Sequence, residues 1–302
     1  MSAPTNRSLS KLAFFSAAIV WGASFAFQKE MVREIGALDF TFWNFFISAV
    51  VFWVYAILKD VKITYRLREG IVLGVFLAGI EIFQMVGLKF ASAADTAFLT
   101  NLGMLLIPYL GWLLLRHKVT LENNIALALA IVGMYLLVGG VSGFGLGTSM
   151  LLLSALSMAY YFLYLERYDS ERNSHLLALL VQQFLVISAI SAAASWLVGA
   201  PLSVERSRVP DLLWLTIVFT TIPYAVVQWA GKYADEMIAA IYDGVVEPLV
   251  GGIVAWVAFA EPTTPLSVGG GVLMVFAFGF GAIFSKRHFL LKRLKALGNY
   301  VR

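Results

Sequence analysis

The sequence predicts an all-α membrane protein with ten transmembrane helices, arranged as two inverted five-helix repeats. The first observation is composition: of 302 residues, 60% are apolar and 13% are charged, and the mean hydropathy is +0.83. A soluble domain averages about 45–50% apolar and about 25% charged residues. The second is length, because a spanning helix needs roughly 20 apolar residues and the chain has room for about ten. The third is an internal similarity, described below.

Apolar runs bounded by charged residues define the predicted spans. In chain order they are Leu12–Gln28, Phe40–Leu58, Gly70–Leu88, Thr96–Leu115, two spans within Asn123–Leu165, Leu176–Val198, Leu212–Gly231, Met237–Ala260 and Leu266–Ser285. The run from Asn123 to Leu165 contains no Asp, Glu, Lys or Arg, and its glycine cluster between Gly139 and Gly147 predicts a turn that divides it. Such continuous hydrophobicity excludes barrel strands, in which apolar and polar residues alternate.

Composition also excludes several classes of function. A soluble enzyme, a disordered chain, a secreted disulfide scaffold and a nucleic-acid-binding domain all need more polar surface or cysteine than this chain has. The three histidines fall at predicted membrane edges, and no G-x-x-x-x-G-K-[ST] motif occurs. We therefore expect no metal, no cofactor and no enzymatic activity; an intramembrane enzyme or an assembly subunit is the least favoured alternative.

Basic residues predict the orientation of the chain. With both termini in the cytoplasm, 17 of the 22 Lys and Arg residues fall on the inner side, as the positive-inside rule requires. The tail 286–302 carries six basic and no acidic residues, interleaved with leucines, which predicts an amphipathic cytoplasmic stretch on anionic membrane lipids. The sequence thus predicts a multi-pass protein of the inner membrane, and its net charge of +4 needs no nucleic-acid partner.

An internal similarity divides the predicted helices into two halves. A shift of 140 residues places Ala94-Asp95, Pro108 and Gly111 on Ala234-Asp235, Pro248 and Gly251. This shift corresponds to five spans. Because five is an odd number, the second copy crosses the membrane in the opposite direction, as in the inverted repeats of many secondary transporters. We predict repeats at 1–141 and 142–285, followed by the tail 286–302. Pro108 and Pro248 then lie at the same depth and are candidate hinges.

Several motifs resemble one known family. They are Trp21-Gly22-Ala23-Ser24-Phe25 followed by Lys29, the segment Ala93 to Pro108, the segment Ile241 to Gly251 with Glu247-Pro248, Glu261, and Gly269-Gly270-Gly271. Together they resemble the drug/metabolite transporter superfamily, and within it the ten-span EamA-type permeases, over essentially the whole chain. The resemblance implies transport of a small solute, but members carry amino acids, sugars, nucleotide derivatives, amines or drugs. Glu81 is not part of the family pattern.

Three acids inside predicted spans are the first candidate site residues. Glu81 lies near the middle of span three and Glu247 near the middle of span nine, and Asp243 lies one turn before Glu247 on the same helix face. A charged group in a span costs about 2.5–3.5 kcal/mol even on lenient scales, so it usually faces the protein interior and serves function. The alternative is structural: Glu247 bonds backbone groups freed by Pro248, or a neutral carboxyl bonds a neighbouring span.

Polar and aromatic residues complete the predicted site. The amides within spans are Gln28, Asn44, Gln84, Asn101 and Gln228, together with Gln182 and Gln183. Each alone is expected to join helices, but as a set they can line a wet cavity. The candidate aromatic walls are Trp21 and Tyr224, followed by Trp43, Tyr160, Tyr161 and Tyr164. Tyr224 is favoured because it follows Pro223, where a kinked backbone can open a pocket.

The predicted function is secondary transport by alternating access. Acids without basic residues at depth disfavour an anionic substrate and favour an amino acid or a related zwitterion or cation, with export as the expected direction. The expected partners are this small solute, protons and membrane lipids, and the oligomeric state is left open. The alternative within transport is efflux of lipophilic cationic drugs, which acids and aromatic rings also recognise.

Overall fold

The structure is a computed structural model that describes residues 3–167, 176–200, 202–233 and 241–299. For residues 3–5, 166–167, 243 and 284–299 it describes the backbone alone. The described residues form helices and connections, with no strand among them. The prediction of an all-α chain is therefore confirmed for this part of the protein.

The helices have the following bounds. In chain order they are α1 (Ala3–Ile35), α2 (Ala37–Leu58), α3 (Leu67–Phe90), α4 (Ala93–Thr100), α5 (Leu102–Leu115), α6 (Leu121–Leu137), the 3₁₀ turn η1 (Gly140–Gly143), α7 (Leu146–Arg167), α8 (Leu176–Leu197), the 3₁₀ turn η3 (Arg206–Arg208), α9 (Val209–Thr216), the π-helix η4 (Ile217–Thr221), α10 (Ile222–Ala230), the π-helix η5 (Tyr242–Val246), α12 (Glu247–Ile253), the π-helix η6 (Val254–Ala258) and α13 (Pro265–Asn299).

Eight helices in the described ranges are long and apolar enough to cross a membrane, counting α4 with α5 and α9 with η4 and α10. Two further apolar helices are shorter, Leu121–Leu137 and Gly244–Ala258. They lie in the predicted fifth and ninth spans. The first helix extends well beyond its predicted end at Gln28, and the last one continues from the predicted tenth span into the tail.

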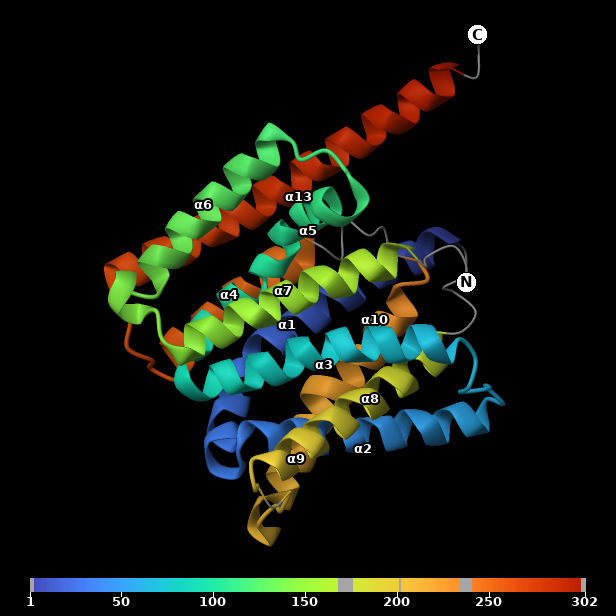
Figure 1. Cartoon of the computed structure of the whole chain (residues 1–302), viewed down its shortest axis with the longest axis vertical. Coiled ribbons are helices and arrows are strands. Elements are labelled where there is room, and N and C mark those ends of the chain that lie inside the picture. The colour runs from blue at the N-terminus through green and yellow to red at the C-terminus, as the bar shows by residue number, and fades with distance from the viewer. Residues whose placement is uncertain (1–2, 168–175, 201, 234–240, 300–302) are drawn as a thin grey trace.

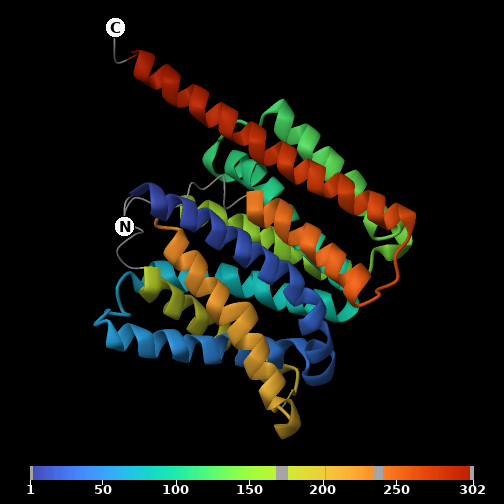
Figure 2. The ribbon, with the colours of Figure 1, turned by 180° about the vertical axis from the view of Figure 1, so that it is seen from behind.

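The helices pack as one bundle with a separate pair on one side. In both views α6 and α13 lie side by side, away from the group formed by α1, α2, α3, α7 and α8 (Figures 1 and 2). Within that group α3 packs against α7 and α8, and α2 packs against α8. The start of α1 and the end of α13 lie at the same end of the bundle (Figures 1 and 2), which we call the terminal end.

Small residues allow the α6–α13 pair to pack at backbone distance. A Cβ atom on Gly133 would lie 2.8 Å from the carbonyl oxygen of Gly270, and one on Gly270 would lie 2.5 Å from the carbonyl oxygen of Gly133. Membrane helices commonly associate through such small residues, because lipid offers no hydrophobic driving force. Within the Gly269-Gly270-Gly271 run, Gly270 and Gly271 are closely packed, whereas a Cβ atom on Gly269 would meet nothing within 4 Å.

Two proline-containing spans contain π-helices directly before the proline. The π-helix η4 precedes Pro223, and η5 precedes Pro248. Proline has no N–H, and its ring crowds the carbonyl of the residue four positions earlier; here this residue is Phe219 or Gly244. Widening the preceding turn relieves the crowding, and single π turns of this kind often occur at functional sites. Pro108, by contrast, lies within the continuous helix α5.

Candidate functional site

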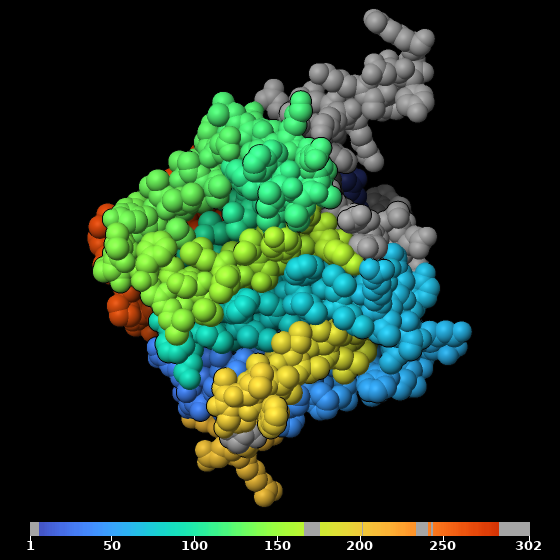
Figure 3. Space-filling model, viewed as in Figure 1, coloured from blue at the N-terminus to red at the C-terminus, as the bar shows by residue number. Residues whose placement is uncertain are grey.

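A cavity of about 280 Å³ lies among α1, α2, α3, α5, α7, α8, α10 and α12. Its volume is slightly below the range of about 300–1,000 Å³ typical of small-molecule pockets. On the face shown in Figure 3, α3, α7 and α8 pack side by side, and their side chains leave no opening between them. The cavity is therefore enclosed laterally by packed helices on this side.

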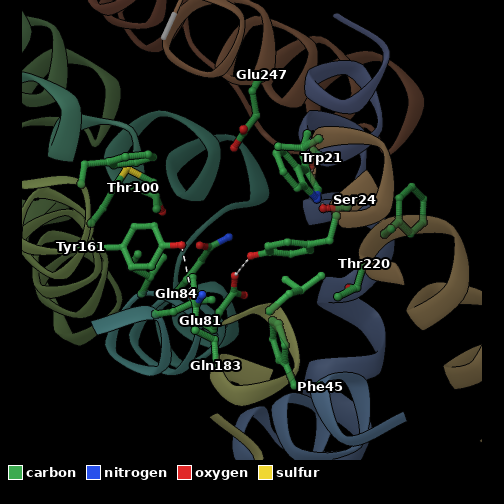
Figure 4. A pocket seen from close by; sticks show the side chains of 18 of the residues that line it. Trp21, Ser24, Phe45, Glu81, Gln84, Thr100, Tyr161, Gln183, Thr220 and Glu247 are labelled. Atoms are coloured by element: carbon green, nitrogen blue, oxygen red, sulfur yellow. Dashed lines mark hydrogen bonds between the residues drawn. The ribbon is translucent and has the colours of Figure 1, made fainter. Parts of the chain in front are cut away.

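Most of the candidate residues meet in this cavity. Those that line it are Trp21, Gln28, Asn44, Glu81, Gln84, Asn101, Tyr161, Tyr224, Gln228 and Glu247. Tyr160 does not line it, and its ring stacks on Phe76 instead, at 5.6 Å between centroids. The side chain of Asp243 lies outside the described part of the structure. The acids Glu247 and Glu81 extend into the cavity from opposite walls (Figure 4).

Glu81 projects from the middle of α3, which is unbroken and contains no proline. Its Oε1 accepts a hydrogen bond of 3.2 Å from the hydroxyl of Tyr224. The Tyr224 ring contacts Trp21 edge-on, with 5.3 Å between centroids, and also contacts Phe184 at 4.9 Å. One acid is thus linked through one tyrosine to an aromatic residue of α1.

Glu247 occupies a different backbone setting. It is the first residue of α12, directly after η5 and directly before Pro248, and its side chain is buried. Its Oε1 accepts a hydrogen bond of 3.2 Å from the Asn101 amide. Asn101 is the residue at which α4 ends and α5 begins, and the same amide nitrogen donates to the carbonyl of Ala97 at 2.9 Å. Two helix breaks therefore meet at the cavity.

A third break adds hydroxyl groups to the site. In η4, Thr220 donates a hydrogen bond of 3.0 Å to Asn44, and Thr221 shares one of 2.9 Å with Ser48. Both bonds hold η4 against α2. Thr220 and, from other helices, Ser24 and Thr100 also line the cavity (Figure 4). These hydroxyl groups were not predicted; Thr220 was detectable only from its position just before Pro223.

Other predicted polar residues are used elsewhere. Gln182 donates from its side-chain nitrogen to the carbonyls of Ile63 and, at 2.9 Å, Tyr65, so it holds the α2–α3 connection. Its neighbour Gln183 lines the cavity and accepts a hydrogen bond of 3.0 Å from Tyr161 (Figure 4). Successive amides on α8 thus have different roles.

The charges of the cavity are of one sign. Among its described lining residues there are two acids, Glu81 and Glu247, and no Lys, Arg or His. A carboxylate removed from water is costly unless it is paired or neutralised. The described lining is therefore suited chemically to a cationic group or to protons, and none of these residues offers an anion a cationic partner.

The end of the cavity away from the chain termini is closed. An apolar plug fills it, with buried members from the six segments α1, α2, α3, α4, α9 and η6: Phe25, Met31, Val32, Phe40, Met85, Leu88, Ala93, Ala94, Ala97, Leu212, Leu215 and Ala255. Toward the terminal end the lining continues to the ends of the helices, to Leu165 on α7, Leu176 on α8 and Gly231 after α10.

An ion pair lies beside the plug. Lys29, on α1, pairs with Glu261, which follows η6. Both side chains are only 12–14% exposed. The carboxylate of Glu261 also accepts hydrogen bonds from the backbone N–H groups of Ala93, at 3.0 Å, and Ala94, at 3.3 Å, at the start of α4. A carboxylate at a helix N-terminus is stabilising, so Glu261 joins three spans; the sequence marked both residues but did not predict their pairing.

Comparison with known proteins identifies similar chains. Residues 9–139 match the EamA-like transporter family. Two proteins of Archaeoglobus fulgidus, each named "Uncharacterized transporter", are similar along most of their length. One is 25% identical over 261 residues, covering 86% of this chain and 81% of the relative. The other is 24% identical over 276 residues, covering 85% and 91%.

A solved crystal structure shares the fold. It superposes with a TM-score of 0.66 at 18% sequence identity, over 93% of this chain and 99% of that one. At this identity the likeness concerns the fold alone. It extends over both the group around α3 and the α6–α13 pair, because almost the whole chain is covered.

Proposed function

We propose that this chain, an EamA-type permease of the drug/metabolite transporter superfamily, exports a small solute with an ammonium group in exchange for protons. The observation that carries the proposal is the cavity with Glu81 and Glu247 and no basic residue among its described lining. Acids inside a membrane protein are rare, and they commonly mark the path of an ion, a proton or a substrate. Protons and a cationic substrate can neutralise these acids in turn.

The size and lining of the cavity favour a metabolite such as an amino acid or a related zwitterion or amine. About 280 Å³ suits a small solute better than a drug-sized one. The amides Gln28, Asn44, Gln84 and Gln228 line the same cavity and can donate hydrogen bonds to a substrate carboxylate. An anion with two or more charges would have no cationic partner among the described lining residues.

Alternating access is supported by the unequal ends of the cavity. The plug and the Lys29–Glu261 pair close one end, while the lining continues to the helix ends at the other. The two π-proline breaks lie within spans that line the cavity. Hinges of this type absorb backbone rotation when a transporter changes the side to which its site opens.

We further propose the two inverted five-helix repeats, 1–141 and 142–285. The family match ends at residue 139, close to this boundary. Asn101, at the break of predicted span four, contacts Glu247 at the break of predicted span nine, so the two related spans approach each other at the site. Of the two matched hinge candidates, Pro248 follows a π-helix and is the one we favour, whereas Pro108 lies inside α5. The tail 286–302 follows the second repeat.

The proposed location is the inner membrane with both termini cytoplasmic and the basic tail on its lipids. The start of α1 and the end of α13 lie at one end of the bundle (Figure 1), in agreement with termini on one side. Because the chain has no cysteine, single cysteines at Ser2, Ser142 and Ser207 test this directly. An impermeant maleimide on intact cells should label the last two and spare the first, and the reverse pattern would contradict the orientation.

Efflux of lipophilic cationic drugs is the second candidate. The observation that favours it is the aromatic wall beside the acids, formed by Trp21, Phe45, Phe219 and Tyr224. Such rings bind cations through their faces. The two candidates differ in the substrate's need for N–H donors, because a quaternary ammonium compound has none to give to carboxylates and amides.

The test uses the purified full-length chain. A thermal-shift panel of amino acids, primary amines, nucleosides and quaternary ammonium drugs identifies binders, because ligands of the folded state raise its apparent stability. Counterflow of the labelled binder in sealed proteoliposomes, with an imposed pH gradient, then measures transport. Faster uptake of an amino acid or amine supports the proposal. Uptake of the quaternary drugs alone favours the second candidate, and chemical conversion of a ligand in detergent would overturn both.

A further inference from the structure

We infer that Tyr224 is a positioning residue that links protonation of Glu81 to the placement of α10 against α1. This inference rests on the function proposed above, because it assumes that Glu81 takes up and releases a proton. The contacts of Tyr224, the backbone on which it lies and the chemistry of its hydrogen bond each support it.

Tyr224 contacts both parts of the site with different ends of one side chain. Its hydroxyl donates to Glu81 on α3 at 3.2 Å. Its ring lies edge-on to Trp21 on α1, with 5.3 Å between centroids and 66° between planes. Any shift of Tyr224 toward or away from Glu81 therefore changes its contact with Trp21.

The backbone allows such a shift. Tyr224 directly follows Pro223, and the π-helix η4 precedes this proline. Thr220 and Thr221 hold η4 to α2 by hydrogen bonds of 3.0 and 2.9 Å. Beyond the proline, α10 packs against α1. Tyr224 is thus at the start of the segment that can rotate about an anchored break.

Protonation changes the strength of the bond that holds Tyr224. A hydroxyl bonded to an ionised carboxylate makes a charge-assisted hydrogen bond, roughly twice as strong as a neutral one. When Glu81 takes a proton from water at one end of the cavity, this bond becomes neutral, and it regains its strength when the proton leaves to water at the other end. Tyr224 keeps its own hydrogen throughout, and no covalent bond other than the O–H of Glu81 is made or broken.

Few other titratable groups face Glu81. Tyr161 on α7 and Glu247 on α12 line the same cavity, whereas the described lining residues of α1, α2, α5 and α8 carry no titratable group. Asp243 precedes Glu247 in η5, but its side chain lies outside the described residues. The hydroxyl of Tyr224 makes the described hydrogen bond to Glu81.

Tyr161 provides a matched control within the same cavity. It is also a tyrosine of the cavity lining, and its hydroxyl also bonds a side chain opposite, at 3.0 Å. The partner is the amide of Gln183, however, which does not titrate. Replacing either tyrosine by phenylalanine removes one hydroxyl from the cavity and keeps the ring.

The experiment measures conformation and needs no knowledge of the substrate. Spin labels at Ile57→Cys on α2 and Trp229→Cys on α10, both on exposed positions, report the distance between these helices in the full-length reconstituted chain. We expect the ratio of the distance populations to change about five- to tenfold between mildly acidic and mildly alkaline pH, the ratio expected when a charge-assisted bond becomes neutral. Tyr224→Phe should reduce the change to less than about twofold, as should Glu81→Gln.

The control variants decide the outcome. Tyr161→Phe should keep the wild-type pH response, and a melting temperature within a few degrees of wild type shows that each variant is folded. A wild-type pH response in Tyr224→Phe, or an equal loss in Tyr161→Phe, would overturn the inference, and so would a normal response in Glu81→Gln. Failure of the counterflow assay with an intact pH response would instead count against the proposed function alone.

Discussion

The two acids of the cavity are carried by backbones of different kinds. Glu81 lies in the middle of α3, which is continuous from Leu67 to Phe90. Glu247 lies between a π-helix and Pro248, and its amide partner Asn101 lies at another helix break. The first acid is fixed to a straight helix, whereas the second is held where two spans can bend. The two carboxyl groups thus share their chemistry but differ in the backbone that carries them, and we expect Glu247 to be the more mobile of the two.

Removing either charge should have the largest effect. A glutamine keeps the size and hydrogen-bonding capacity of the side chain but does not titrate. We therefore expect Glu81→Gln and Glu247→Gln each to lower pH-driven transport by about 10- to 100-fold, the loss expected for a hydrogen-bonded charged group. Uptake into proteoliposomes with an imposed pH gradient measures this. Wild-type rates with unchanged pH dependence in both variants would make the acids structural.

Shortening the acids should separate them. In Glu81→Asp the carboxyl withdraws by one methylene on a rigid helix and loses Tyr224, so transport should fall about as far as in Glu81→Gln. In Glu247→Asp the flexible backbone can restore part of the contact with Asn101. We expect the second variant to transport roughly tenfold faster than the first, the factor that corresponds to one retained hydrogen bond to a charge. Equal losses in the same uptake assay would show that the backbone difference is irrelevant.

Much of the fold follows from the sequence because lipid imposes strict demands on the chain. Charge-free runs locate the helices, since a buried charge or an unpaired backbone group is costly in a bilayer. The same logic misplaces the end of α1: the charge of Lys29 was expected to end the span, but the helix continues to Ile35, and Lys29 pairs with Glu261. The pairing depends on a residue 232 positions away, which no local pattern reveals.

The candidate site could be predicted from residues whose burial in a membrane costs much free energy. Residues whose burial costs little could not be assigned to it. Glu81 and Glu247 are conspicuous in apolar spans. Hydroxyl groups are not conspicuous, because they can donate a hydrogen bond to a backbone carbonyl of their own helix. Thr100 donates to the carbonyl of Thr96 at 2.9 Å, and Ser24 donates to that of Trp21 at 2.7 Å. Similarly, a helix that is apolar all round does not reveal which side faces the cavity. The sequence alone therefore did not separate the neighbours Tyr160 and Tyr161.

The closed end of the cavity offers a comparison of two ion pairs. Lys29–Glu261 is largely buried and joins three spans, whereas Arg208–Glu34 is 38% and 31% exposed. Exposed pairs contribute about 0–1 kcal/mol, and buried ones cost several kcal/mol when one partner is removed. Loss of the buried pair in Lys29→Gln should destabilise the closed end of the cavity. We therefore expect maleimide labelling of Val254→Cys, beside the plug, to rise by roughly three- to tenfold, which corresponds to about 0.7 to 1.4 kcal/mol in the opening equilibrium.

Arg208→Gln is the matched control for this measurement. It removes a cation from the same end of the bundle, but from an exposed position, and should leave labelling of Val254→Cys within about twofold of wild type. If both variants increased labelling equally, the general loss of positive charge would explain the effect. In that case Lys29 would have no specific part in closing the cavity.

The smallest effect separates the two prolines that the internal similarity treats as equivalent. Pro248 follows the π-helix η5, whereas Pro108 lies inside the continuous helix α5. Pro248→Ala restores an N–H that can bond the carbonyl of Gly244, so the turn should tighten and the folded state should gain up to about 3 kcal/mol, the usual cost of an interior proline. The loss of the break should slow transport roughly two- to fivefold, a barrier increase of about 0.4–1 kcal/mol.

Pro108→Ala removes no π-helix and should stabilise the protein while leaving the rate within about twofold of wild type. Melting temperature and uptake rate measured on both variants decide the matter: equal slowing would indicate two equivalent hinges, and no slowing in Pro248→Ala would move the hinge to Pro223 or Asn101.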